Sequence, residues 1–78
     1  MVIKILGGGC KNCQNLYKNT LEALETVGIE AQVLKVEDIN EIMSYGVMKT
    51  PALVVDDQVK IMGRVAKYKE LVKMFETN

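Results

Sequence analysis

The amino-acid sequence predicts a small α/β domain with the element order β-α-β-α-β-β-α. Two hydrophobic patterns support this order: four short apolar, β-rich segments, and two longer segments with apolar residues at helical spacing. A capping pattern, Asp38 followed by Glu41, adds a third and shorter helix. The 78 residues suit a single domain, 1–78, and about half of them are hydrophobic, which is enough for one core.

The first half of the chain forms a β-α-β unit. Residues 2–6 are β-rich and end at three consecutive glycines, and residues 29–36 form a second strand. Between them, apolar residues recur every three or four positions, which predicts a helix from Cys10 or Lys11 to Val27, before a glycine that stops it. Since a single helix joins the two strands, they should be parallel, with a right-handed crossover.

The short helix that follows begins at Asp38. Its apolar residues Ile39, Ile42 and Met43 should face inward, and Gly46 should end it. We therefore expect this helix to bury its apolar side chains against the sheet.

The last third of the chain predicts a hairpin and a helix. Residues 52–55 and 59–62 are apolar segments joined by the turn signal Asp56-Asp57, which indicates an antiparallel pair. No residue from Arg64 to Lys67 is a good N-cap for the helix that follows. Its apolar residues are spaced i, i+3, i+4, i+7: Tyr68, Leu71, Val72 and Phe75.

Composition excludes several classes of partner. Ten basic side chains balance ten acidic ones, so we expect neither nucleic acid nor a membrane surface as a partner. No apolar run approaches the roughly 20 residues that span a bilayer. The apolar start at residues 2–6 is also too short for a signal peptide. These features predict a cytoplasmic protein.

The candidate chemistry lies in the two cysteines, Cys10 and Cys13. In a reducing cytosol, a Cys-x-x-Cys pair is more often catalytic or metal-binding than a structural disulfide. The chain contains no histidine, which removes the commonest metal ligand and the usual general base. The dithiol is therefore the predicted functional site.

The placement of the two thiols predicts different roles for them. Cys10 lies where a strand ends and a helix begins, so unpaired backbone N–H groups and the helix dipole favour its thiolate. Cys13, one turn later, should point inward. We expect Cys10 to attack a substrate disulfide and Cys13 to resolve the mixed disulfide. The glycine run before Cys10 should let the backbone approach the cysteines and a bound substrate.

Two other classes of function compete with this interpretation. One is a soft-metal carrier that holds copper or zinc with the same thiolates, but such copper domains end in a strand and this chain ends in a helix. A zinc site would need two further ligands, usually Cys or His. Methionines 43, 48 and 62 are potential soft ligands, although we expect them to fill the core. The other class is a binding module whose dithiol is incidental.

The motifs together resemble the thioredoxin superfamily. Glycines before Cys10-Lys11-Asn12-Cys13, Thr50-Pro51 before a hairpin, and the segment 61–65 carry the resemblance, which covers essentially the whole chain. More specifically, the chain resembles the short archaeal and bacterial thioredoxin-like proteins called redox-active disulfide protein 2, sometimes described as glutaredoxin-like. This resemblance implies a four-stranded mixed sheet flanked by helices.

The resemblance also implies a substrate site around the dithiol. Pro51 would be in the cis form opposite the cysteines, and the main chain of Thr50 would pair with a substrate strand. Gly9, Lys11 and Asn12 would contact the substrate beside the thiols.

The function implied is that of a protein-disulfide oxidoreductase, a thioredoxin- or glutaredoxin-like electron carrier. It would need no cofactor or metal beyond its own dithiol. Its partners would be disulfide-containing proteins and a thioredoxin-reductase-like electron donor, and it would act as a monomer. Thioredoxins carry an acid six residues before the first cysteine, where this chain has Lys4. We therefore predict that no buried carboxylate acts as a base for Cys13.

Overall fold

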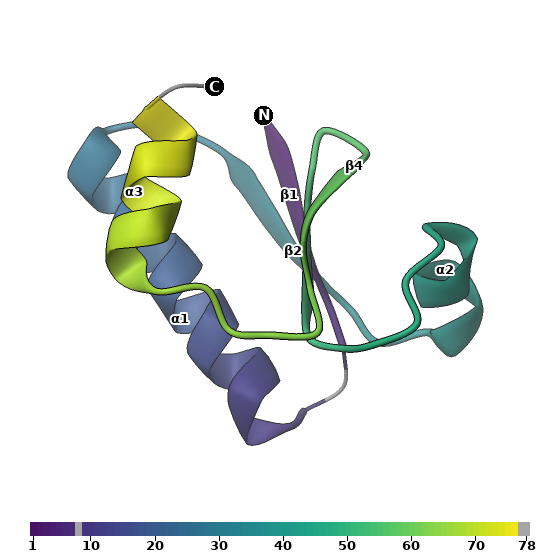
Figure 1. Cartoon of the computed structure of the whole chain (residues 1–78). Helices are drawn as coiled ribbons and strands as arrows, with labels where there is room; N and C mark the ends of the chain where they lie inside the picture. Colours follow the sequence, from purple (N-terminus) through teal and green to yellow (C-terminus); the bar gives the residue numbers. More distant parts are fainter. Residues whose placement is uncertain (8, 77–78) are drawn as a thin grey trace.

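The computed structural model describes residues 1–7 and 9–76, and its element order is the predicted one (Figure 1). In this part of the chain, no helix is both long and apolar enough to cross a membrane. The elements are β1 (Val2–Leu6), α1 (Lys11–Val27), β2 (Gln32–Val36), α2 (Ile39–Ser44), β3 (Ala52–Val55), β4 (Gln58–Met62) and α3 (Tyr68–Glu76).

The four strands form one mixed sheet in the order β2-β1-β3-β4. β1 and β2 are parallel, whereas β1–β3 and β3–β4 are antiparallel. This arrangement confirms the predicted β-α-β unit, the hairpin and the mixed sheet. Both turn residues of the hairpin, Asp56 and Asp57, have positive φ angles of 48° and 68°, as the favoured two-residue hairpin turns require.

The helices cover both faces of the sheet (Figure 1). α1 and α3 lie side by side on one face and α2 lies on the other. Because side chains alternate along a strand, Leu53 and Val55 of β3 pack towards α1 and α3, and Ala52 and Val54 pack towards α2. All four are buried, which explains why the sequence of β3 is continuously apolar.

The main core lies between the sheet and the pair α1–α3. Phe75 and Leu71 of α3 contribute side chains that are 1% and 0% exposed. The buried residues of this cluster are Ile3, Ile5, Leu16, Ala23, Leu24, Leu53, Val55, Ile61, Ala66, Leu71 and Phe75. The cluster on the α2 face is smaller: Leu6, Val36, Ile42, Val47, Ala52 and Val54.

β2 begins at Gln32, three residues later than the sequence predicts. Gly28 ends α1 in the left-handed conformation (φ 78°), and the Ile29 N–H donates to the Leu24 C=O at 3.2 Å. These bonds keep the chain in a helix C-cap. The sheet ladder starts only where the Gln32 N–H reaches the Met1 C=O at 3.0 Å.

α2 departs further from the prediction. Asp38 caps it as expected, accepting a hydrogen bond from the Asn40 N–H at 2.9 Å. Only Ile42 is buried, however, whereas Ile39 and Met43 are 68% and 64% exposed. The prediction that all three face inward was wrong because a helix of six residues packs on the sheet with little more than one side chain.

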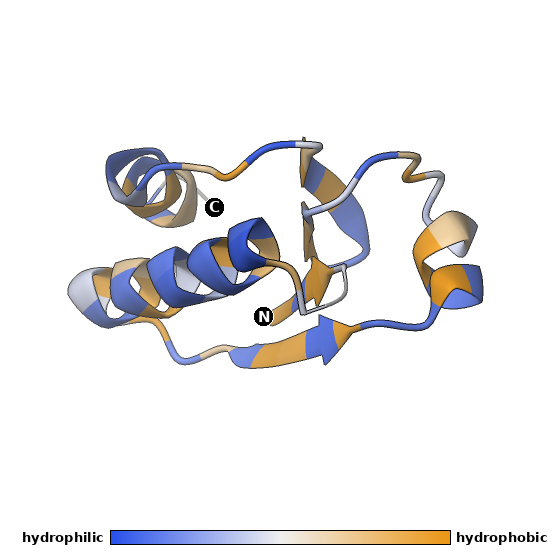
Figure 2. Ribbon diagram, turned by 90° about the horizontal axis from the view of Figure 1, so that it is seen from below, coloured by the Kyte–Doolittle hydropathy of each residue, from blue (hydrophilic) through white to orange (hydrophobic). Residues whose placement is uncertain are grey.

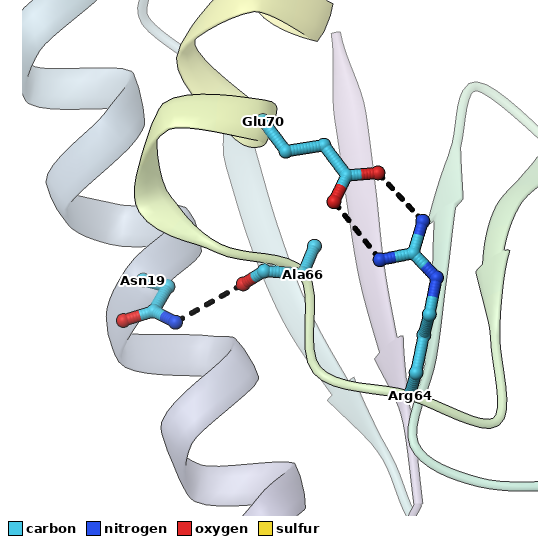
Figure 3. Close-up of polar contacts among 4 residues, drawn as sticks. All are labelled: Asn19, Arg64, Ala66 and Glu70. Atoms are coloured by element: carbon cyan, nitrogen blue, oxygen red, sulfur yellow. Dashed lines mark hydrogen bonds and ion pairs between the residues drawn. The ribbon is translucent and has the colours of Figure 1, made fainter.

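Residues 64–67, before α3, offer no good capping side chain. A hydrogen bond from α1 and an ion pair between Arg64 and Glu70 hold the start of the helix instead (Figure 3). The Asn19 side-chain amide donates to the Ala66 C=O at 3.1 Å. Arg64 forms a bidentate ion pair with Glu70, with N–O distances of 2.9 and 2.6 Å. These contacts fix the chain between β4 and α3.

Candidate functional site

Cys10 is exposed at the N-cap of α1, at the end of the sheet where β1 finishes. Its Sγ accepts a hydrogen bond from the Cys13 N–H at 3.1 Å. This is the position in which a backbone N–H of the first helical turn stabilises negative charge. The backbone N–H of Cys13 is therefore placed to stabilise a thiolate at Cys10.

Cys13 lies one turn into α1 and is buried, with 5% of its surface exposed. A disulfide joins it to Cys10, and the two Cα atoms are 5.1 Å apart. The predicted contrast between an exposed first cysteine and a buried second one is confirmed. A substrate that reaches this end of the sheet meets Cys10 first.

Gly7 determines how closely the backbone approaches the dithiol. A Cβ atom on Gly7 would lie 2.6 Å from the Sγ of Cys13, and the residue has a φ of 144°. Gly9 has no atom within 4 Å of such a position, and Gly8 lies outside the described residues. The expected close approach of the glycine run to the cysteines is therefore made at Gly7, which we did not single out from the sequence.

Thr50 and Pro51 lie in the loop before β3, and the peptide bond between them is cis. Pro51 is buried and Thr50 is exposed. A Cβ atom added to Gly7 would lie 3.4 Å from the Cβ of Thr50 as well as 2.6 Å from the Sγ of Cys13. The structure thus brings the Thr50–Pro51 loop beside the dithiol.

Gly63, at the end of β4, holds this loop in place. Its N–H donates to the Pro51 C=O at 2.9 Å, and its φ is 75°. A Cβ there would be 3.0 Å from the Cβ of Lys49. The segment containing Gly63 contributed to the resemblance, but its contact with the proline loop was not predicted.

The other predicted substrate-binding residues surround Cys10 on the surface. Gly9, Lys11 and Asn12 are all exposed. The Gln14 side-chain amide donates to the Gly9 C=O at 3.1 Å, which ties the turn before Cys10 to the first turn of α1. All three residues are therefore open to a substrate bound at Cys10.

Lys4 does not serve the dithiol. Its Nζ donates to the hydroxyl of Tyr45 at 2.5 Å, and this hydrogen bond raises the pKa of Lys4. The ammonium group is thus held at the loop after α2, and it connects β1 to the segment that leads to Thr50.

A small cavity of about 180 Å³ lies behind Cys13. Lys35 of β2 and Glu37, which follows β2, line it together with Ile5 and Gln14. Glu37 is exposed, and Thr20 is the one buried polar or charged residue in the described part of the chain.

Metal binding has no support in the geometry. Within residues 1–7 and 9–76 no group of three or more His, Cys, Asp or Glu side chains is placed to hold an ion. The methionines that we expected in the core are instead exposed: 64% for Met43, 92% for Met48 and 52% for Met62. None of the three fills the core, and they lie in three different segments of the chain.

Comparison with known proteins agrees with the fold and the site. The thioredoxin domain family matches residues 1–76. The chain belongs to the thioredoxin family. It is 45% identical over 74 residues to a thioredoxin of Methanothermobacter thermautotrophicus, a match that covers 95% of this chain and 96% of that protein. It is 38% identical over 71 residues to a thioredoxin of Methanocaldococcus jannaschii, covering 91% of this chain and 81% of the relative.

Membership of the thioredoxin family and the paired cysteines together support a thiol–disulfide redox function. The resemblance first drawn from the Cys-x-x-Cys and Thr-Pro motifs is thereby confirmed at the level of the superfamily. The copper or zinc carrier, which would use the same thiolates, has no such support.

Proposed function

We propose that the protein reduces disulfide bonds in other proteins, with Cys10 as the nucleophile and Cys13 as the resolving thiol. The observation that carries this proposal is the asymmetry of the pair. Cys10 is exposed and its Sγ receives a backbone hydrogen bond, whereas Cys13 is 5% exposed. A thiol that attacks a bulky protein disulfide must be exposed, as Cys10 is. A thiol that resolves the mixed disulfide within the same chain can be buried, as Cys13 is.

The reaction transfers two electrons in two exchanges. The Cys10 thiolate attacks one sulfur of the substrate disulfide, so that the substrate S–S bond breaks and its other sulfur leaves as a thiolate and takes a proton. Cys13, having lost its proton to solvent, then attacks the Sγ of Cys10. The mixed disulfide breaks, the second substrate thiol is released, and the Cys10–Cys13 disulfide forms.

The surroundings of the dithiol suit a polypeptide substrate. Gly9, Lys11 and Asn12 leave the surface around Cys10 open, and Thr50 is exposed beside Gly7. We assign these residues, with the buried Pro51 as the support of the Thr50 loop, to substrate binding.

A thioredoxin-reductase-like donor would return two electrons to the disulfide after each cycle. The protein would work in the cytoplasm, where the dithiol can be kept reduced. We further propose that the protein acts as a monomer and needs no cofactor besides the dithiol.

The test is insulin-disulfide reduction with dithiothreitol as electron donor, using the wild type, Cys10→Ser and Cys13→Ser. We expect Cys10→Ser to lose activity. Cys13→Ser, reduced first and then separated from dithiothreitol so that no external thiol resolves the intermediate, should accumulate a mixed disulfide with insulin that mass spectrometry detects.

Turnover by Cys10→Ser at the wild-type rate would contradict the proposal. So would a mixed disulfide that forms through Cys13 in that variant. An incidental dithiol on a binding module would leave the biological function intact in the Cys10→Ser/Cys13→Ser double variant, whereas our proposal requires its loss.

A further inference from the structure

The two ends of the sheet carry charges of opposite sign, although the chain as a whole is neutral. The register pairs Leu6 with Ala52 and Ala52 with Met62, so the end of β1, the start of β3 and the end of β4 lie together beside the dithiol (Figure 1). The hairpin turn lies at the opposite end, where the Asp56 N–H donates to the Val2 C=O at 2.8 Å.

Three segments meet at the dithiol end of the sheet, and every charged side chain in them is basic. They are residues 9–19, 45–53 and 61–67, and their charged residues, all exposed, are Lys11, Lys18, Lys49, Arg64 and Lys67. Figure 2 views the molecule from this end and shows hydrophilic stretches along α1 and in the loop between β4 and α3. Segments 20–31 and 54–59, at the other end, contain only acidic charges: Glu22, Glu25, Glu30, Asp56 and Asp57.

This distribution of charge does not serve the stability of the helix that carries the dithiol. α1 has no acidic residue in its first turn and no basic residue in its last turn, whereas the helix dipole favours both. Arg64 is bound to Glu70, but the structure gives Lys11, Lys18 and Lys49 no ion pair with a described residue. We call these three lysines the basic surface, and their charges are available to a partner.

Two lysines of the basic surface lie directly beside the redox site. Lys11 follows Cys10 in the chain and is exposed with it. Lys49 precedes Thr50, and its Cβ and Cδ lie 3.0 and 3.3 Å from the point that a Cβ on Gly63 would occupy, so its stem runs along the end of β4. A polypeptide whose disulfide reaches Cys10 therefore passes close to both side chains.

The acidic residue at this end of the sheet lies on the other side of the dithiol. Glu37 lines the cavity behind Cys13 and follows β2, which is the opposite edge strand from β4. The sign of the charge therefore changes across the dithiol, and the positive side is the one formed by α1, the loop before β3 and the end of β4.

We propose that the basic surface binds acidic residues of the substrate polypeptide, so that the protein preferentially reduces disulfides flanked by Asp or Glu. Charges of opposite sign around a binding site speed the encounter and suppress partners with the wrong charge. The inference rests on the proposed disulfide reductase function, to which it adds a substrate class.

The test uses two peptide disulfides that differ only in the residues flanking the reactive cysteine, which are Glu in one and Lys in the other. The reduced protein is separated from dithiothreitol and mixed with each peptide, and the second-order rate constant of peptide reduction is measured. The ratio of the two constants, Glu peptide over Lys peptide, is compared between proteins, because the intrinsic reactivity of each peptide then cancels.

Lys11→Glu/Lys49→Glu should lower this ratio by about tenfold at low ionic strength, since an exposed charge pair contributes up to about fivefold and two pairs are reversed. In the wild type, about 1 M NaCl should lower the ratio several-fold, because the screening length falls to about 3 Å.

The matched control is Lys60→Glu/Lys69→Glu, which changes the net charge by the same amount outside the three basic segments. Lys60 lies within β4. Lys69 follows Tyr68, whose hydroxyl contacts that of Thr26 near the far end of α1. The control should keep the wild-type ratio to within about twofold, because charges farther than the screening length contribute little.

Several results would overturn the inference while the proposed function stands. One is a wild-type ratio equal to that of Lys11→Glu/Lys49→Glu, and another is a wild-type ratio that salt does not lower, which needs no variant to fold. An equal fall for the control pair would assign the effect to net charge. Inhibition by a single-stranded oligonucleotide, at a concentration where polyglutamate has no effect, would assign the basic surface to nucleic acid. If the wild type reduces neither peptide, the proposed function fails and the inference fails with it.

Discussion

The two faces of the sheet are built differently. On one face, the sheet and the pair α1–α3 enclose a core cluster of eleven buried apolar residues among those that the structure describes. Leu71 and Phe75 of α3 belong to it and are 0% and 1% exposed. On the other face, α2 is six residues long, and the core cluster has six buried apolar residues in the described part of the chain. Ile39 and Met43 of α2 remain mostly exposed beside an open groove.

This difference separates stability from recognition. A face that is fully packed against two helices provides most of the hydrophobic free energy of folding. A face covered by one short helix leaves apolar side chains free to contact a partner. The dithiol lies at the junction of the two faces. Cys13 belongs to α1, and the adjacent Gly7 also lines the groove formed by α2 and the loop after it.

The largest expected effect comes from one truncation on each face. Leu71→Ala should lower the free energy of unfolding by about 4 kcal/mol, and Ile42→Ala by about 2 kcal/mol, because a large-to-small change costs more where the surroundings are completely packed. Urea unfolding at equilibrium measures both. Equal losses would remove the distinction between the two faces.

Gly7 tests the junction between the faces. Gly7→Ala would place a Cβ 2.6 Å from the Sγ of Cys13 at a φ of 144°, and it should cost about 1–3 kcal/mol of stability as well as most of the insulin-reducing activity. Gly9→Ala is the matched control, because its Cβ would meet no atom within 4 Å, and its stability should stay within about 0.5 kcal/mol of the wild type. If Gly7→Ala were as stable as this control, the close approach would be unimportant.

The smallest effect concerns the ion pair that precedes α3. The hydrogen bond from Arg64 lowers the pKa of Glu70. Because the folded pKa is below the unfolded value of about 4.3, the pair stabilises the fold above that pH and its contribution is lost as the pH falls through the folded pKa. Glu70→Gln should therefore lower Tm slightly at pH 7, and the difference from the wild type should shrink below about pH 4.

The exposed Glu22 of α1 offers the control for this ion pair. Glu22→Gln makes the same replacement outside the Arg64–Glu70 ion pair, so it should lower Tm at pH 7 by less than Glu70→Gln does. A difference for Glu70→Gln that persisted unchanged at acidic pH would contradict the role of its charge.

The sequence predicted the features that local patterns determine. The element order, the stop of α1 before Gly28 and the burial of Cys13 all follow from periodicity and glycine placement, and the structure has them. The turn at Asp56-Asp57 is also where the pattern placed it.

Features that depend on which elements meet in space were not predicted. The spacing of Ile39, Ile42 and Met43 is helical, but periodicity does not tell how much of a short helix the sheet covers. Similarly, Gly63 is adjacent to the site only because the Pro51 loop, which is distant in sequence, folds against it. The groove could not be inferred from the pattern for the same reason.

The most direct test of the account is the order in which the two thiols of the reduced protein react. Iodoacetamide is added near pH 7 in limiting amount, and peptide mapping locates the label. Exposure of Cys10 and the hydrogen bond from the Cys13 N–H predict that Cys10 is alkylated well before Cys13. Labelling of Cys13 first, or of both thiols at the same rate, would contradict the assignment of Cys10 as the nucleophile.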